Sequence, residues 1–179
     1  MVDAVETGRL FAFLPGILRV NEQIPDLAGS QDFLGINYYG GNLARISLFP
    51  PSATVPPPGA PFSDIGWVIY PKGLYDIMHQ VHRRYPGKPI LITENGLADH
   101  RDALRPAFIA DHLRWLHQAI REGVPVEGYY HWSLLDNFEW SDGFGPCFGL
   151  CAVDYRTGKR TPRPSAWLYA GIAARNGLY

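Results

Sequence analysis

The chain has 179 residues and a net charge of −1, so it is long enough for one domain with a sizeable core and lacks the basic surface that nucleic-acid binding requires. Hydrophobic residues make up 46% and charged residues 18%, which is typical of a globular protein and excludes a disordered or fibrous one. No stretch approaches the about 18 apolar residues of a membrane span. The acidic start, Met1 to Glu6, is no secretory signal, so we expect a cytoplasmic protein without a membrane partner.

The first third of the chain predicts one helix, one strand and one long loop. Residues 3–20 carry apolar side chains at helical spacing that is interrupted by Pro15 and Gly16, which indicates a helix followed by a turn. Residues 31–39, QDFLGINYY, predict a strand that ends in polar side chains. Residues 40–66 are rich in proline and predict an irregular segment. A loop of this length is either functional or a tolerated surface insertion, and the sequence leaves both open.

The remainder alternates between helices and strands. It predicts, in order, a helix at 71–85, a strand from residue 90 to Glu94, a helix at 105–122, a strand at 124–132, a polar and aromatic loop, and a helix at 164–176. Such alternation implies parallel strands joined by crossover helices, which is the α/β class. A closed eight-stranded barrel needs at least about 200 residues, so three strands leave this chain short of a barrel.

Polar and aromatic residues gather where the three predicted strands end. Asn37 and Tyr39 end the first strand, Glu94 and Asn95 end the second, and Trp132 ends the third, ahead of Asp136, Asn137, Glu139 and Trp140. Parallel strands end at the same edge of a sheet, so we expect these side chains at one mouth. Aromatic faces and paired hydrogen-bonding groups suit a sugar. Taken singly, Glu94 could cap a helix, Trp132 could be core and Glu139 could form a loop salt bridge.

Five motifs in order carry a resemblance to a known family: DFLGINYY, ITENG, WSLLDNFEW, FGL followed two residues later by VDY, and RTPRPSAWLY. They resemble glycoside hydrolase family 1, the retaining β-glucosidases and β-galactosidases of the (β/α)8 TIM barrel. The resemblance implies that residues 1–179 form the C-terminal part of a single glycosidase domain. That part is about the last three βα units, barrel strands six to eight, plus a preceding helix, with residues 40–66 as a long proline-rich loop.

The resemblance also implies site residues. Glu94 would be the catalytic nucleophile, Tyr39 would donate a hydrogen bond to it with Asn37 alongside, Trp132 would stack on the sugar, Glu139 and Trp140 would bind its hydroxyls, and Phe148 would shape the hydroxymethyl pocket. The family needs no cofactor or metal. His79 and His82 lie three residues apart on a predicted helix but have no convincing carboxylate or cysteine partner, so no metal site is expected. The expected ligand is a β-glycoside or small sugar.

Two departures from the family limit these expectations. The acid/base glutamate lies in a TxNEP-like motif in the family, and no such motif occurs here, so the chain is expected to be inactive unless complemented. Cys147 occupies a position that is often basic in relatives, and we expect both Cys147 and Cys151 to be buried or partly buried thiols.

Open strand edges predict a partner, either the missing N-terminal barrel segment or a second copy. The alternative is a non-catalytic sugar-binding or structural remnant that self-associates.

Overall fold

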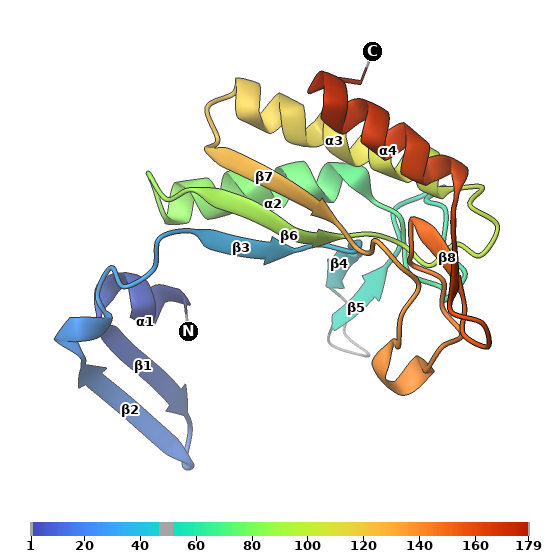
Figure 1. Ribbon diagram of the computed structural model, residues 1–179. Coiled ribbons are helices and arrows are strands. Elements are labelled where there is room, and N and C mark those ends of the chain that lie inside the picture. Colours follow the sequence, from blue (N-terminus) through green and yellow to red (C-terminus); the bar gives the residue numbers. More distant parts are fainter. Residues whose placement is uncertain (1, 47–51, 179) are drawn as a thin grey trace.

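The computed structural model describes residues 2–46 and 52–178, and its centre is a three-stranded parallel sheet (Figure 1). The strands are β3 (Leu34–Asn37), β6 (Ile90–Asn95) and β7 (Val126–His131), and their order in the sheet is β3-β6-β7. Both ladders are parallel, so the three strands end at the same edge, as predicted.

Three helices lie on one face of this sheet: α2 (Pro71–Arg84), α3 (Arg105–Arg121) and α4 (Pro164–Arg175) (Figure 1). Each has proline in its first turn, where the fixed backbone angle suits a helix and the missing N–H costs no hydrogen bond. One buried cluster joins α2 and α3 to the sheet, and it includes Leu74, Met78, Ile90, Ile92 and Leu116. A second cluster joins α3 to α4. The predicted α/β class, the three strands and these three helices are confirmed.

The helix predicted over residues 3–20 is wrong for most of its length. Only α1 (Val2–Thr7) is helical, and it is followed by an antiparallel hairpin of β1 (Arg9–Leu14) and β2 (Leu18–Gln23). Pro15 and Gly16, which has a φ of 72°, occupy the turn between the strands. The apolar residues from Leu10 to Leu14 therefore form a continuous run along a strand instead of following a helical stripe, and the turn signal belongs to a hairpin.

The two segments predicted as irregular also contain strands. In the 40–66 segment, β4 (Leu43–Ile46) pairs antiparallel with β5 (Ser52–Val55), while residues 47–51 lie outside the described part of the chain. The polar and aromatic loop contains a short 3-10 helix, η2 (Trp140–Asp142), and the hairpin of β8 (Cys151–Asp154) and β9 (Lys159–Pro162). A further 3-10 turn, η1 (Pro25–Leu27), precedes β3. Two-residue alternation in such short strands is too brief to separate from loop sequence.

The sheet is open at both edges and bare on one face. Within the described residues, β3 and β7 each pair only with β6, so the barrel is not closed. A Cβ at Gly128 would meet Leu91 and Tyr130, which places these residues together on the side opposite the helices. Tyr130 is 60% exposed there. Parallel sheets are normally covered on both faces, whereas the described residues cover only one face of this sheet. No helix of the described residues is long and apolar enough to cross a membrane.

Candidate active site

The carboxylate of Glu94 lies at the end of β6, beside the phenol of Tyr39. The Tyr39 hydroxyl donates to Glu94 Oε2 at 2.5 Å. Burial and this hydrogen bond raise the pKa of Tyr39 far above its ordinary value, so the phenol keeps its proton at neutral pH and remains a donor. A permanent donor orients the carboxylate and stabilises its negative charge.

Asn95, next to Glu94, ties the ends of the three strands together. Its side chain is completely buried. Its Nδ2 donates to the main-chain oxygen of Tyr38 at 2.7 Å, and its Oδ1 accepts from the Tyr129 hydroxyl at 2.7 Å. One side chain on the central strand thus contacts Tyr38, which directly follows β3, and Tyr129, which lies within β7. These two hydrogen bonds tie the backbone next to Glu94 to both neighbouring strands.

Two aromatic rings, those of Trp67 and Phe148, pack around the Tyr39–Glu94 pair. Tyr39 meets Trp67 at a centroid distance of 5.4 Å and Phe148 at 6.1 Å, in both cases edge to face. Phe148 is 1% exposed, whereas Trp67 is 44% exposed and presents its ring to solvent beside the site. Sequence reasoning missed Trp67. The available signal was an aromatic residue directly after Gly66, close before the helix that begins at Pro71.

A second polar pair comes from the loop after β7. Trp132 Nε1 donates to Glu139 Oε1 at 3.1 Å. The charge of Glu139 also raises the pKa of Tyr39, so this carboxylate lies within electrostatic reach of the first pair. A sugar that stacks on Trp132 would find both an indole N–H and a carboxylate at its edge.

Among the described residues, the side chains of two expected site residues make no hydrogen bond with Glu94, although Asn37 lies opposite it in the ladder of β3 and β6. Trp140 is 85% exposed, and no ring contact or hydrogen bond of the described residues links it to the pair. Asn37 accepts a hydrogen bond from Thr93 Oγ1 at 2.6 Å and is exposed at the end of β3. The roles implied for these two residues remain predictions.

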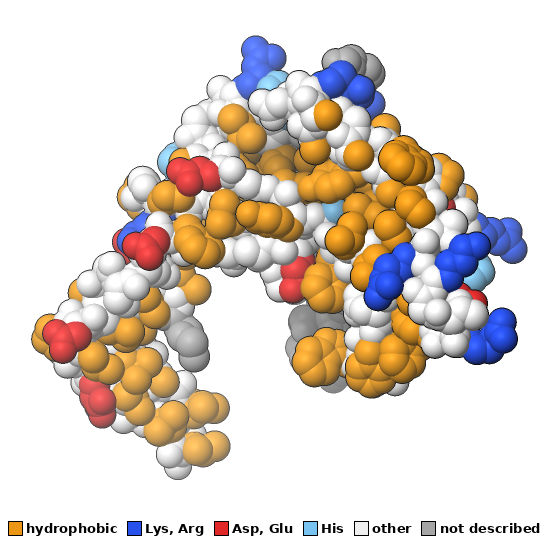
Figure 2. Space-filling view, viewed as in Figure 1, with side chains coloured by type: hydrophobic (Ala, Val, Ile, Leu, Met, Phe, Trp, Pro, Cys, Tyr) orange, Lys and Arg blue, Asp and Glu red, His pale blue; other side chains and the backbone are white. Residues whose placement is uncertain are grey.

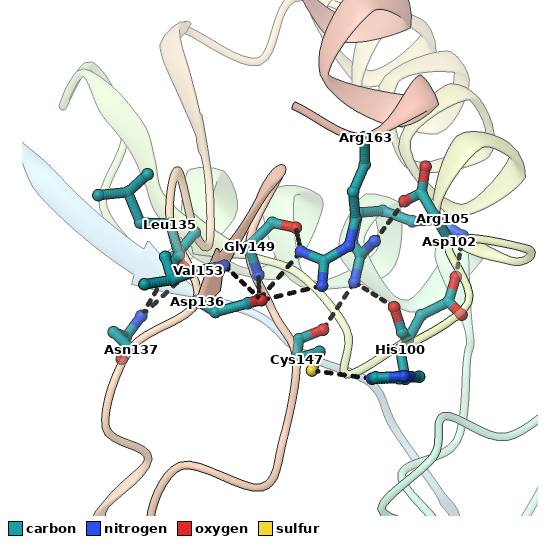
Figure 3. Close-up of polar contacts among 12 residues, drawn as sticks. His100, Asp102, Arg105, Leu135, Asp136, Asn137, Cys147, Gly149, Val153 and Arg163 are labelled. Carbon is teal, nitrogen blue, oxygen red and sulfur yellow. Dashed lines mark hydrogen bonds and ion pairs between the residues drawn. The ribbon is translucent and has the colours of Figure 1, made fainter. Parts of the chain in front are cut away.

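Two buried ion pairs support the loops that carry the site (Figure 3). Asp136 binds Arg163 through both guanidinium Nη atoms, at 3.0 and 2.9 Å, and accepts from Gly149 N at 2.8 Å. Arg105 pairs with Asp102 and donates from Nη2 to the main-chain oxygens of Asp99 and Cys147, at 2.7 and 2.6 Å. These contacts join the loop after β6 to the loop after β7.

Cys147 lies at the edge of this network. Its Sγ is 3.3 Å from Nδ1 of His100 (Figure 3), and burial raises the pKa of the thiol. Cys147 and Cys151 are both free and partly buried, as predicted. Across residues 2–46 and 52–178, no group of three or more His, Cys, Asp or Glu side chains is arranged to hold a metal ion.

The parallel strands, the helices that cover one face and the carboxylate at the strand ends define the class: part of a (β/α)-barrel domain. The sequence profile of Glycosyl hydrolase family 1 matches residues 16–178. The chain belongs to this family, and the resemblance read from the motifs is confirmed.

Individual proteins and solved structures of this family are similar to most of the chain. It is 40% identical over 167 residues to the β-galactosidase of Sulfolobus acidocaldarius, covering 86% of this chain and 33% of the relative. The solved β-glycosidase from Pyrococcus horikoshii is 38% identical with a TM-score of 0.81, over 96% of this chain and 40% of that one. The β-glucosidase from Thermotoga maritima in complex with castanospermine is 36% identical with a TM-score of 0.80, over 86% and 37%. The chain spans about a third of the length of the curated relatives it matches.

Proposed function

We propose that this chain is the C-terminal, nucleophile-bearing part of a retaining β-glycosidase domain. The proposed reaction is the hydrolysis of terminal β-D-glucosides or related β-glycosides by double displacement. The observation that carries the proposal is the 2.5 Å hydrogen bond from Tyr39 to Glu94 at the end of the central parallel strand. A buried donor on a strand-end carboxylate is the arrangement that an oriented nucleophile requires.

Glu94 would attack the anomeric carbon, so that the bond to the leaving oxygen breaks and a glycosyl-enzyme ester forms. Water would then cleave the ester and release the sugar with its original anomeric configuration. Tyr39 would donate to the same carboxylate before attack and after its release, so that its hydrogen bond orients Glu94 in each cycle.

Retention also needs a general acid/base carboxylate about 5–5.5 Å from the nucleophile. The resemblance places that residue on a barrel strand that precedes the part matched here. We therefore propose that the chain is inactive on its own and active when the remaining part of the domain completes the barrel. Glu139 does not fill this role in the proposal, because it is paired with Trp132 on the sugar-binding side.

The substrate class follows from the side chains near Glu94 and from relatives. The matched Thermotoga enzyme is described as a β-glucosidase, with structures in complex with glucoimidazole and with castanospermine. In this chain, Trp132 would stack on the sugar in the subsite next to the cleaved bond, Glu139 would accept from its outer hydroxyls, and Phe148 would close the pocket for its hydroxymethyl group. Trp140 and Asn37 would add hydrogen bonds once the domain is complete.

The test is hydrolysis of an aryl β-glucoside by the chain alone and by the chain mixed with the N-terminal segment of the Thermotoga maritima β-glucosidase. We expect activity only in the mixture, reduced to background by Glu94→Gln and unchanged by Glu22→Gln, an exposed glutamate on β2. Activity from the chain alone would contradict the assignment of the acid/base to the missing part. Assembly without hydrolysis would favour the alternative, a non-catalytic sugar-binding or structural remnant.

A further inference from the structure

The hairpin of β1 and β2 extends away from the rest of the chain, beside the start of β3 and so at the end of the sheet opposite the candidate site (Figure 1). Among the described residues β1 and β2 pair only with each other, and the element that packs against them is α1. At the base of the hairpin, Ile24 N donates to the main-chain oxygen of Gly8 at 2.7 Å. Arg84 of α2 donates to Asp3 of α1 at 2.6 and 3.0 Å. The hairpin is thus attached to the helices at its base, and its turn lies at the far end from these contacts.

The tip of the hairpin is an apolar run between two arginines. Residues 10–18, LFAFLPGIL, contain no polar or charged side chain, and Arg9 and Arg19 stand directly on either side of them. Ile17, in the turn, is 82% exposed, and Phe11, Phe13, Leu14 and Leu18 are exposed as well. Figure 2 shows apolar side chains gathered along this projecting hairpin. A contiguous exposed apolar surface of this kind indicates an interaction site.

The register of the hairpin arranges these residues in levels. Leu14 pairs with Leu18 beside the turn, and Phe13 pairs with Arg19 at the next position. Directly opposed residues of an antiparallel pair share one face, so Phe13 and Arg19 lie on the same face. Aliphatic side chains at the tip, followed by an aromatic ring and a guanidinium, match the order of groups from the acyl chains of a bilayer outward to its headgroups.

The charges of the hairpin match an anionic surface, although the whole chain has a net charge of −1. No acidic residue occurs between Arg9 and Glu22. Glu22 pairs with Leu10, four residues from Leu14. This separation is about 14 Å at about 3.4 Å per residue, which exceeds the Debye length of about 8 Å at physiological ionic strength. The charge that the hairpin itself carries near its tip is therefore positive.

We propose that the tip of this hairpin, residues 13–19, inserts into the surface of a lipid bilayer that contains anionic lipids. The strand edges set the depth. The outer edges of β1 and β2 carry main-chain groups without a strand partner among the described residues, and such groups cannot enter the hydrocarbon core. Insertion is therefore limited to the turn and its flanking pairs, a depth comparable with the about 5–10 Å of interfacial amphipathic helices.

A bilayer suits this tip better than a second copy of the chain. The tip is convex, so a protein partner needs a matching groove, whereas fluid lipids need no preformed site. A symmetric contact through the tips would bring the two Arg19 side chains together, and their like charges would oppose it. The expectation of no membrane partner was based on the lack of a spanning segment, and a peripheral contact requires none. The proposal goes beyond the proposed function and does not depend on the role of Glu94.

The test is sedimentation of the chain with large unilamellar vesicles, made either of phosphatidylcholine alone or of an equimolar mixture with phosphatidylserine. Two variants change the tip: Ile17→Gln removes its most exposed apolar side chain, and Arg19→Gln removes its charge. Each has a matched control elsewhere: Ile120→Gln changes an exposed isoleucine of α3, and Arg83→Gln changes an exposed arginine of α2. Both tip residues are exposed, so neither change removes a buried contact.

We expect the chain to bind the mixed vesicles, Ile17→Gln to weaken this binding at least about 10-fold and Arg19→Gln to weaken it about 5-fold, with both controls unchanged. Arg19→Gln should leave binding to pure phosphatidylcholine unaltered, because the effect is electrostatic. Glu94→Gln should bind vesicles like the unchanged chain, so a failure of the proposed function would leave this result in place.

No binding by the unchanged chain, or equal binding by Ile17→Gln and Ile120→Gln, would overturn the proposal. A dimer that forms without vesicles and that Ile17→Gln dissociates would also overturn it, since the tip would then contact a second copy. Loss of vesicle binding when the N-terminal segment of the Thermotoga maritima β-glucosidase is added would do the same, since the remaining part of the domain would then cover the tip.

Discussion

The buried ion pair between Asp136 and Arg163 gives a sharp prediction about stability. Asp136 accepts from both guanidinium Nη atoms of Arg163, from Gly149 N at 2.8 Å and from Val153 N at 3.4 Å. The two charged side chains are only 6% and 10% exposed. Asp136→Ala would leave a buried guanidinium without its counter-charge, which costs about 3–5 kcal/mol. Domains are stable by about 5–15 kcal/mol, so this change would remove a large fraction of the free energy of unfolding.

Urea unfolding followed by tryptophan fluorescence measures this loss. The control is Asp111→Ala, which removes one partner of a helical ion pair with Arg114 whose side chains are 48% and 49% exposed. An exposed pair contributes at most about 1 kcal/mol, so the control should unfold at nearly the same urea concentration as the unchanged chain. If Asp136→Ala costs no more than Asp111→Ala, the buried pair does not hold the loops as argued.

Two further predictions concern backbone space and pH. Gly96→Ala would put a Cβ 1.7 Å from the main-chain oxygen of Trp132, so we expect insoluble or strongly destabilised protein. The control is Gly145→Ala, whose Cβ would lie 3.5 Å from its nearest neighbour. It should behave like the unchanged chain in the same expression and urea assays. Burial lowers the pKa of His112 to about 4. In the unfolded chain the His112 imidazole binds a proton with a pKa of about 6.5, whereas in the folded chain it stays neutral down to about pH 4. The free energy of unfolding therefore falls by up to about 1.4 kcal/mol per pH unit from pH 6.5 to 4. Burial also lowers the pKa of His131, to about 3, so that residue adds a second dependence of the same sign. His112→Asn should therefore reduce the slope by about half in urea titrations at pH 7, 6 and 5, and an unchanged slope would contradict the assignment.

The parallel sheet and its helices could be predicted from sequence because their signals are local and long. The apolar stripe of α2 runs over four turns, and the Ile90–Ile92 run is short, apolar and bounded by turn residues. The N-terminal hairpin could not be predicted in the same way. The apolar run from Leu10 to Leu14 shows no two-residue alternation and also fits a helix of one or two turns, and only the pairing of β1 with β2 separates the two interpretations.

The candidate site likewise combines residues that local sequence patterns predict with residues that only the folded structure brings together. The strand ends predicted that Glu94 and Tyr39 lie at one edge of the sheet, and the family resemblance implied the hydrogen bond between them. Trp67 could not be assigned to the site, because it follows the proline-rich segment 40–66, whose path the sequence does not predict. Its ring contact with Tyr39 exists only in the folded chain. Neither could the two buried ion pairs around Arg105 and Arg163, whose partners lie on loops that no periodicity describes.

The structure divides the proposed chemistry unevenly between this chain and the rest of its domain. The described residues already hold the surroundings of Glu94 in place: the Tyr39 donor, the hydrogen bonds of Asn95 to Tyr38 and to Tyr129, and the aromatic packing by Phe148. All of these contacts are made within this chain. These surroundings of Glu94 therefore belong to this chain, whereas the proposed function assigns the acid/base carboxylate to the remaining part of the domain. Closure of the barrel would then add catalysis without rebuilding the nucleophile, because its hydrogen-bond partner is already in position.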